Sequence, residues 1–402
     1  MNPSHQQIMA LAEKYSDYTA GNLTRLINHK SLSLQEKGVQ EELMRQMLEA
    51  GFDEVRMDGL GNVIGRIGYG SRSLAFDAHM DVVDIGHEGN WDFDPLGGEV
   101  KNGFVHGRGS VDQKGGAAAF VTAGRILKDL AFERDLSVYF VGSVIEEDCD
   151  GLCWKYLVEE EGLKPDVVVS TEPTNLGIYR GQRGRMEMHV HFYGVSSHGS
   201  APERGVNAIY MASRTALEIE KLNERLAFDG FLGKGSVTIS EIISGSPSLC
   251  AVADYARIHL DRRLTWGETK ESAIKEVEGL IEAMNAKVEM LHYQETSFTG
   301  LRYGMEKYYP TWKLEESHPA IQLAARTFEN TFSKKPRIDK WTFSTNGVTI
   351  NGYYGIPVIG FGPGNEVLAH APNEKVPVSD LVAASAFYAA LAFEMAHQET
   401  EK

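Results

Sequence analysis

Hydrophobic and polar positions in the first half of the chain follow the patterns of helices and short strands. Apolar residues recur at helical spacing from Ser16 to about Ala50, which predicts a helix. The stretch GFDEVRMDGLGNVIGRIG then alternates around its glycines and predicts a hairpin of edge strands. A helical pattern also covers about 116–130, and three short apolar runs lie near it, at 73–76, 136–144 and 166–170. Strands that alternate with helices predict an α/β fold.

The three apolar runs all end in polar, acid-rich segments. These segments read DAHMD after the first run, IEED after the second and TEP after the third. Open α/β sheets bind their ligands beyond the carboxyl ends of the strands. We therefore expect the chemistry of this protein at the ends of these three strands.

The pattern changes after Gly184. MEMHVHFYGV alternates like a strand, NAIYMASRTALEIEKL has helical spacing, and GSVTISEII and DYARIHLDRR follow as strands. A helix at 269–285 and a strand near 286–291 complete a β-α-β-β-α-β order, which is the ferredoxin-like pattern. We predict that residues 184–297 form an inserted α+β domain, and that 1–183 and 298–402 together form the main domain.

The chain length supports this division. The chain has 402 residues, which exceeds the ~250–300 residues at which a single core usually stops growing. After the proposed insertion the main domain resumes with helical SHPAIQLAARTFENTF, a buried-looking run at 353–361 and a closing helix at about 379–397.

Composition narrows the classes of partner and compartment. The N-terminal residues lack a secretory signal, and three cysteines cannot build a disulfide framework, so we expect a cytoplasmic protein. No run approaches the ~18 apolar residues of a membrane span. The net charge of -16 repels nucleic acid and anionic lipid. We expect neither a membrane nor a nucleic-acid partner.

His79 and Asp81 in FDAHMD are the first candidates for a metal site. Side chains two apart on a strand point to the same side, so these two can act together on one metal ion. A hydrogen-bonded histidine near a turn gives the same short pattern. The triplet alone does not decide between the two interpretations.

Further acids and a histidine occur at strand ends and in glycine-rich loops. Asp112 lies in GRGSVDQKGG, Glu146 and Glu147 are adjacent after an apolar run, Glu172 precedes a proline, and His370 lies in GNEVLAHAPNEKV. Each one alone fits an ordinary surface turn or loop. Together, two histidines and four or more acids match the mixed nitrogen and oxygen ligands of zinc or a similar divalent ion.

Six segments in this order carry a resemblance to a known enzyme family: HMD, GRGSVDQKGG, EED, TEP, SSHGSAPERGVNAI and AHAPNE. They resemble the acetylornithine deacetylase, succinyl-diaminopimelate desuccinylase and glutamate carboxypeptidase family of two-zinc hydrolases, over about residues 10–395. Within it, the sequence most resembles the branch called selenium metabolism-linked hydrolases, which does not fix a substrate. The resemblance implies a zinc-peptidase-like catalytic domain with a central mixed sheet and two divalent ions per chain, zinc with cobalt or manganese as alternatives. It also implies that the inserted domain is a lid that forms a homodimer.

The resemblance implies roles for individual residues. The metal ligands are Asp112, which bridges both ions, His79 and Glu172 in one site, and Glu147 and His370 in the other. Asp81 orients His79, and Glu146 is the general base that moves a proton from the metal-bridging water to the leaving nitrogen. His198 in SSHGS matches a lid histidine that stabilises the oxyanion in the partner's site, although the local sequence also fits a plain loop histidine.

Further positions bear on the substrate. Arg263 in LDRR matches the family arginine that binds a substrate carboxylate, although arginines at strand ends are often surface ion-pair partners. Ser344 and Thr345 in WTFSTNG stand where the family has hydroxyl groups near that carboxylate. Asn346 replaces a usual Asp, and Cys250 in CAVA replaces a frequent Asn, so both departures fall in the region that sets specificity.

The leading functional hypothesis is hydrolysis of an amide-type C–N bond in a small N-acyl or N-carbamoyl amino acid or a dipeptide. One alternative is aminopeptidase action on short peptides, which requires an acid that binds the substrate amine. Another is a metal-bound ligand-binding protein without turnover. An intact Glu146 argues against the last alternative, because a binding protein needs no base beside its metals.

Overall fold

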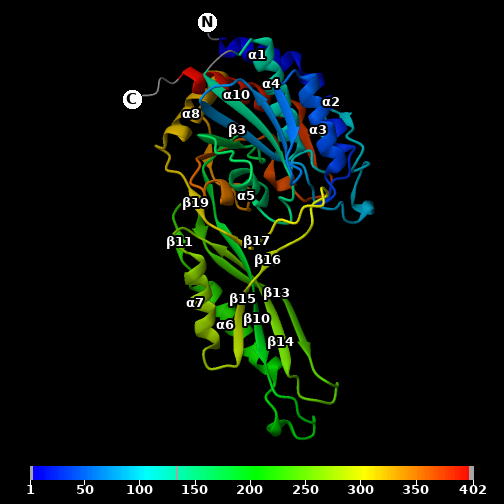
Figure 1. Ribbon diagram of the computed structural model, residues 1–402, viewed down its shortest axis with the longest axis vertical. Coiled ribbons are helices and arrows are strands. Elements are labelled where there is room, and N and C mark those ends of the chain that lie inside the picture. The colour runs from blue at the N-terminus through cyan, green and yellow to red at the C-terminus, as the bar shows by residue number, and fades with distance from the viewer. Residues whose placement is uncertain (1–2, 133–134, 398–402) are drawn as a thin grey trace.

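Eight strands form the larger sheet, in the order β1-β2-β6-β3-β7-β21-β8-β20. The computed structural model describes residues 3–132 and 135–397, and Figure 1 shows this sheet in its upper part. The apolar runs form three neighbouring parallel strands, β3 (Arg72–His79), β6 (Leu136–Ser143) and β7 (Val167–Ser170). The other five are β1 (Glu54–Met57), β2 (Val63–Ile67), β8 (Ile178–Tyr179), β20 (Ile338–Asp339) and β21 (Val358–Gly360). Because β2 joins β6 antiparallel, the sheet is mixed, as predicted.

Helices pack around this sheet, so its central strands are apolar on both faces. The long helix α10 (Val378–His397) packs on α4 (Lys114–Asp129), which also contacts α2 (Ser16–Ile27). The remaining helices of this part are α1 (His5–Lys14), α3 (Lys37–Glu49), α5 (Leu152–Glu159), α8 (Pro319–Phe332) and α9 (Gly347–Ile350). The predicted α/β class is confirmed.

α10 is long and apolar enough to cross a membrane by length and composition alone. However, 67% of its most apolar window is buried inside the protein. Its Phe387 ring stacks on Phe361, which directly follows β21. α10 is therefore a core helix of this fold.

The single helix predicted at 16–50 is wrong. The structure has two helices there, α2 and α3, separated by residues 28–36. Side chains of this connection bond to distant backbone, as when Ser31 Oγ donates to the carbonyl of Met80 at 2.8 Å. Tertiary contacts of this kind override a helical pattern.

The inserted segment forms a second sheet, in the order β13-β14-β10-β15. Its strands are β10 (Gly184–Tyr193), β13 (Ser236–Gly245), β14 (Tyr255–Leu264) and β15 (Ala286–Met290), with helices α6 (Ala208–Glu224) and α7 (Lys270–Ile281) between them. This is the predicted ferredoxin-like order. The segment has its own hydrophobic cluster, which supports the proposed division at 184–297. The sheet also includes β18 (Tyr308–Tyr309), which pairs with β10 from beyond that boundary.

Short elements complete the chain. The strands are β4 (Val100–Lys101), β5 (Phe104–His106), β9 (Gly181–Gln182), β11 (Phe228–Asp229), β12 (Gly233–Lys234), β16 (His292–Tyr293), β17 (Met305–Glu306), β19 (Trp312–Lys313) and β22 (Lys375–Pro377), and the 3-10 turns are η1 (Glu88–Asn90), η2 (Pro202–Arg204) and η3 (Glu366–Leu368). β9 pairs with β19, and β16 pairs with β17. These two pairs lie where the chain passes between the two sheets (Figure 1).

The parallel central strands bring the candidate residues to one edge of the larger sheet. His79 at the end of β3 is in register with Ser143 at the end of β6. Asp77 of β3 is in register with Ser170, which ends β7. The segments that follow these strands therefore meet in space.

Candidate metal centre and active site

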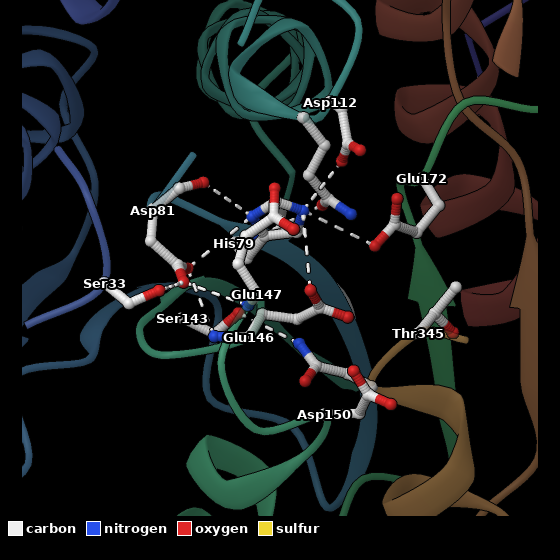
Figure 2. Close-up of polar contacts among 12 residues, drawn as sticks. Ser33, His79, Asp81, Asp112, Ser143, Glu146, Glu147, Asp150, Glu172 and Thr345 are labelled. Carbon is white, nitrogen blue, oxygen red and sulfur yellow. Dashed lines mark hydrogen bonds and ion pairs between the residues drawn. The ribbon is translucent and has the colours of Figure 1, made fainter. Parts of the chain in front are cut away.

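Asp112 lies just before α4, and its two carboxylate oxygens face different histidines. Its Oδ1 lies 2.8 Å from His79 Nε2, and its Oδ2 lies 3.4 Å from His370 Nε2. Figure 2 shows Asp112 and His79 directed toward each other. A carboxylate placed between two imidazoles can contribute one oxygen to each of two cations.

His79, Asp112 and Glu172 form the first group of donors. Glu172 Oε1 lies 3.7 Å from His79 Nε2, and one ligand atom from each of the three residues lies within 4.8 Å of the others. All three residues are buried. The other ring nitrogen of His79 contacts the backbone carbonyl of Asp81 at 2.8 Å, which directs Nε2 toward this group.

Glu147 and His370 form the second group together with Asp112. Glu147 Oε2 lies 3.0 Å from His370 Nε2. His370 has a left-handed backbone, with φ at 60°, and its side chain is 55% exposed. The second group therefore opens to solvent, whereas the first is enclosed.

A buried ion pair holds the Asp112 and His370 loops together. Arg108 Nη1 lies 2.7 Å from Glu374 Oε2, and Arg108 also donates to the His370 carbonyl at 3.4 Å. Glu374 Oε1 accepts hydrogen bonds from the backbone N–H of Val111 and of Asp112. Both charged side chains are almost fully buried. The pair thus bonds to the backbone of both loops.

The donor set fits two divalent cations. Within the described residues, Glu146 Oε1, Glu147 Oε1 and Glu172 Oε2 are buried without a hydrogen-bond partner. Burial raises the pKa of all three carboxyl groups, and the neighbouring carboxylates raise it further. Crowded, buried acids with free oxygens require positive charge nearby. Imidazole nitrogens and carboxylate oxygens are ligands that zinc and similar ions accept.

Residues 75–394 match the sequence pattern of peptidase family M20/M25/M40. The chain belongs to this family. It is 51% identical to the uncharacterized protein YgeY of Escherichia coli (strain K12), over 95% of this chain and 96% of that protein. It is 28% identical to the succinyl-diaminopimelate desuccinylase of Methylocella silvestris, over 92% of this chain and 97% of that enzyme. The solved structure of Bacillus subtilis YxeP, described as a dinuclear metal-binding peptidase of the M20 family, has a TM-score of 0.70 at 14% identity and covers 96% of this chain and 100% of that one.

Membership of the M20/M25/M40 family confirms the resemblance and the fold predicted from the sequence. The chain is a hydrolase that acts on amide bonds, and the family binds two metal ions. The alternative of a ligand-binding protein without turnover is therefore not retained. The metal identity and the substrate are matters for proposal below.

Glu146 lies beside the metal groups, as its predicted role requires. Its Oε2 is 3.9 Å from His79 Nε2, and its side chain is buried (Figure 2). Asp81 contacts the His79 ring mainly through its backbone carbonyl, because its carboxylate Oδ1 is 3.6 Å away. That carboxylate instead accepts the backbone N–H groups of Glu146 and Glu147. Asp81 thus contacts the ring with its main chain and the base-bearing turn with its side chain.

A cavity of about 330 Å³ opens on the metal groups. Arg263 and Ser344 line it, as predicted for substrate-binding residues. Asp150, Arg185 and Glu366 also line it, and none of the three was predicted from the sequence. The local sequence EEDCDG could have indicated Asp150, because this acid lies three residues after Glu147. Arg185 and Glu366, in contrast, reach the cavity only through the fold.

Two arginines from the inserted segment face this cavity, and both have acidic partners. Arg263 Nε and Nη2 bond to the two carboxylate oxygens of Asp261, at 2.8 and 3.0 Å. Arg185 Nη1 lies 3.4 Å from Asp150, and its Nη2 bonds to Glu187. Asp150 belongs to the loop after β6, so the Arg185–Asp150 pair joins the two parts of the protein inside the cavity.

Thr345 and Asn346 are both buried and hydrogen-bonded within the protein, and neither is among the residues that line the cavity. The Thr345 hydroxyl is fully buried and bonds to Gln182 Oε1 at 2.6 Å, so it is already engaged. Asn346 is also buried; its Nδ2 donates to Asp77 at 2.9 Å, and its Oδ1 accepts the N–H of Gly151. The Asn346 departure therefore changes a buried network rather than a surface that contacts substrate.

His198 lies on a surface loop of the inserted segment. Its ring contacts Ser200 Oγ at 2.7 Å, and its backbone pairs with Ala251, next to the exposed Cys250. Arg185, near the start of β10, lines the cavity, whereas Tyr193 ends this ten-residue strand, which is roughly 30 Å long at strand spacing. His198 and Cys250 therefore lie toward the far end of the sheet from their own cavity.

Proposed function

We propose that this protein is a two-metal hydrolase, with zinc the expected metal, that cleaves the amide-type C–N bond of a small N-acyl or N-carbamoyl amino acid or a dipeptide. The observation that carries this proposal is the pair of donor groups that share Asp112 and face a small cavity with an arginine in its wall. A volume of about 330 Å³ suits a small amino-acid derivative. The relatedness to succinyl-diaminopimelate desuccinylases supports the same substrate class.

The residues of the site have complementary tasks. His79, Asp112 and Glu172 would hold one ion, and Asp112, Glu147 and His370 the other. Two such ions would polarise the scissile carbonyl and lower the pKa of a nearby water. Glu146 takes the proton of the attacking water and delivers it to the leaving nitrogen. Burial raises the pKa of Glu146, which favours a carboxyl group that can hold this proton between the two steps.

Arg263 is the proposed partner of a substrate carboxylate. Its bonds to Asp261 use two of the five guanidinium N–H groups. The remaining donors can form a bidentate contact with a carboxylate in the cavity. Ser344 also lines the cavity, and its hydroxyl, which lies 3.5 Å from Gln182 Nε2, can donate a hydrogen bond to the same carboxylate.

We also propose that the protein is a cytoplasmic homodimer that associates through the inserted segment. β13 pairs with β14 on one side, and no described strand pairs with its other edge. Ile242 and Ile243 on β13 are exposed, as are Tyr210 and Leu217 on α6, which packs beside β13. An apolar edge strand of this kind favours pairing with a second copy. The partner's loop would then supply His198 to this chain's site as an oxyanion donor.

A substrate screen tests the proposed reaction. Purified protein loaded with zinc, cobalt or manganese is assayed against N-acyl amino acids, N-carbamoyl amino acids and dipeptides. We expect turnover of at least one class that depends on the added metal. Failure of every class with all three metals, in protein shown to hold two ions, would reject the proposed substrates.

Aminopeptidase action on short peptides is the second candidate. It requires an acid for the substrate amine, and the cavity offers Glu366, whose buried Oε2 has no hydrogen-bond partner among the described residues. A series of peptides of two to five residues separates the two candidates. Rates that fall sharply beyond the dipeptide support the first function, whereas rates that rise with length support the second.

A further inference from the structure

The backbone that carries Glu146 and Glu147 is strained. Ile145, directly before them, has a φ of 63°, in the left-handed region. That region is unfavourable for a β-branched residue, because its side chain crowds the following carbonyl oxygen. Ile145 is also almost fully buried, so it cannot relax outward. Some other part of the structure must hold this conformation.

Three consecutive backbone N–H groups in this turn bond to two buried carboxyl groups. Ile145 N–H donates to Glu36 Oε1 at 3.0 Å. The next two N–H groups, of Glu146 and Glu147, donate to Oδ1 and Oδ2 of Asp81 at 3.2 and 3.0 Å. These bonds fix the peptide planes from which the base and a metal ligand project.

Glu36 comes from a part of the chain far from the site in sequence. It directly precedes α3, but its side chain does not cap that helix. The carboxyl group is instead fully buried against the turn at Ile145. Nearby, Ser33 Oγ donates to Asp81 Oδ2 at 2.7 Å, as Figure 2 shows. Residues of the connection between α2 and α3 thus bond to the turn directly, through Glu36, and to Asp81, which itself bonds to the turn.

We propose that Glu36 is a positioning residue for catalysis: its carboxyl group accepts the Ile145 N–H, stabilises the left-handed turn, and so directs Glu146 and Glu147 into the site. This inference rests on the proposed function, in which Glu146 is the base and Glu147 a metal ligand. A merely structural role would be different, because loss of Glu36 would then lower stability without a specific effect on the turn.

Substitutions at Glu36 and Ile145 separate these roles. Glu36→Gln retains an oxygen acceptor of the same length, whereas Glu36→Leu removes it. Burial and the nearby Asp81 carboxylate raise the pKa of Glu36 to about 8, so a neutral amide is a close substitute near pH 7. Ile145→Gly removes the penalty for a left-handed φ and lets the turn form without help from Glu36.

The expected results form a pattern. Glu36→Gln keeps kcat within about threefold of the unchanged protein, and Glu36→Leu lowers kcat by roughly 10²-fold with a smaller change in KM, as for a misplaced catalytic group. The double variant with Glu36→Leu and Ile145→Gly has a kcat at least about fivefold higher than that of Glu36→Leu alone. Glu36→Leu also weakens binding of the second metal ion, measured by titration of the metal-free protein with Co²⁺ or Zn²⁺, because Glu147 is displaced.

Glu42 provides the matched control. It is a buried carboxylate on α3 whose partners are Arg25, Arg45 and Gln46, so it has no part in the turn. Glu42→Leu should lower the thermal midpoint without a change in the second metal affinity. Where Glu36→Leu does not fold, Glu36→Asp, which withdraws the carboxylate by one methylene, replaces it.

Two outcomes overturn the inference. The first is normal metal titration and kcat in Glu36→Leu. The second is an equal loss with and without Ile145→Gly, which would mean that Glu36 acts on stability alone. If the unchanged protein hydrolyses none of the substrates, the proposed function fails, but the metal titration still decides whether Glu36 positions Glu147.

Discussion

At the scale of single residues, the site contains acids that differ in task because their surroundings differ. Asp112 lies between two imidazoles, whereas Glu146 lies near one, that of His79, and has an oxygen without a hydrogen-bond partner among the described residues. A base must be able to release and accept a proton, and a ligand must stay ionised. Their positions agree with these separate roles.

Glu146→Gln should therefore separate catalysis from metal binding. The amide retains the shape of the side chain but cannot accept a proton, so we expect kcat to fall by roughly 10²–10⁴-fold. The protein should still bind two ions, measured by elemental analysis of the same sample. Near-normal turnover in this variant would assign the base to another residue.

Asn346→Asp should destabilise the fold, and more so at higher pH. Asn346 donates to the buried carboxylate of Asp77, whose pKa is raised by burial. A second carboxylate there replaces a donor with a like charge, at a cost of about 2 kcal/mol or more. A carboxyl group whose pKa is raised in the folded state makes the folded protein less stable as pH rises, because ionisation then favours the unfolded state. The loss of stability caused by Asn346→Asp should therefore be larger at pH 8 than at pH 6. Denaturant midpoints measure it, with the exposed Asn90→Asp as a control that should show neither effect.

At the scale of elements, the inserted segment contributes Arg185 and Arg263 to its own chain's cavity from one end of the second sheet. Its other end carries His198. A roughly 30 Å strand separates the two ends, so one segment can serve two different cavities. The exposed edge of β13 offers a place where two such sheets could join.

Mixing two inactive variants tests this arrangement. His198→Ala should lose roughly 10²–10³-fold in kcat, as expected when one oxyanion donor is removed. Combined with Glu146→Gln chains, it should give heterodimers in which one site has both Glu146 and the partner's His198. Each heterodimer should then be active at that one site, so the mixture should regain a fraction of the activity of the unchanged protein. No recovery after verified subunit exchange would mean that His198 serves its own chain or only the loop structure.

At the scale of the whole molecule, the metal centre joins segments from distant parts of the chain. Its ligands extend from His79 to His370, so bound ions would link the end of β3 and the segments after β6 and β7 to the loop before β22. A ligand that binds only the folded state stabilises it, by about 2.7 kcal/mol at a concentration 100 times its Kd.

Metal removal should consequently lower both activity and stability. We expect two divalent ions per chain at saturation, and a strong chelator should abolish turnover and lower the thermal midpoint by several degrees. Added zinc should restore both. Elemental analysis that never exceeds one ion per chain, under saturating zinc, would contradict the two-metal assignment.

Local patterns in the sequence determined the class of the fold and singled out candidate acids and histidines, and the family resemblance assigned the metal ligands among them. The ends of β3, β6 and β7 are visible as apolar runs that stop in acids, because strand burial and strand termination leave a local signal. Parallel strands bring those ends to one edge. His79, Glu147 and Glu172 come from these strand ends, and the loops that carry Asp112 and His370 complete the two groups.

Only the tertiary structure decided which side chains contact one another across long stretches of sequence. Periodicity does not show that Glu36 bonds to Ile145, that Asn346 bonds to Asp77, or that Arg185 reaches the cavity. The same limit explains the break between α2 and α3, where the connecting residues bond to distant backbone instead of continuing a helix. These contacts form because packing leaves buried polar groups that must find partners, and the partner depends on the whole fold.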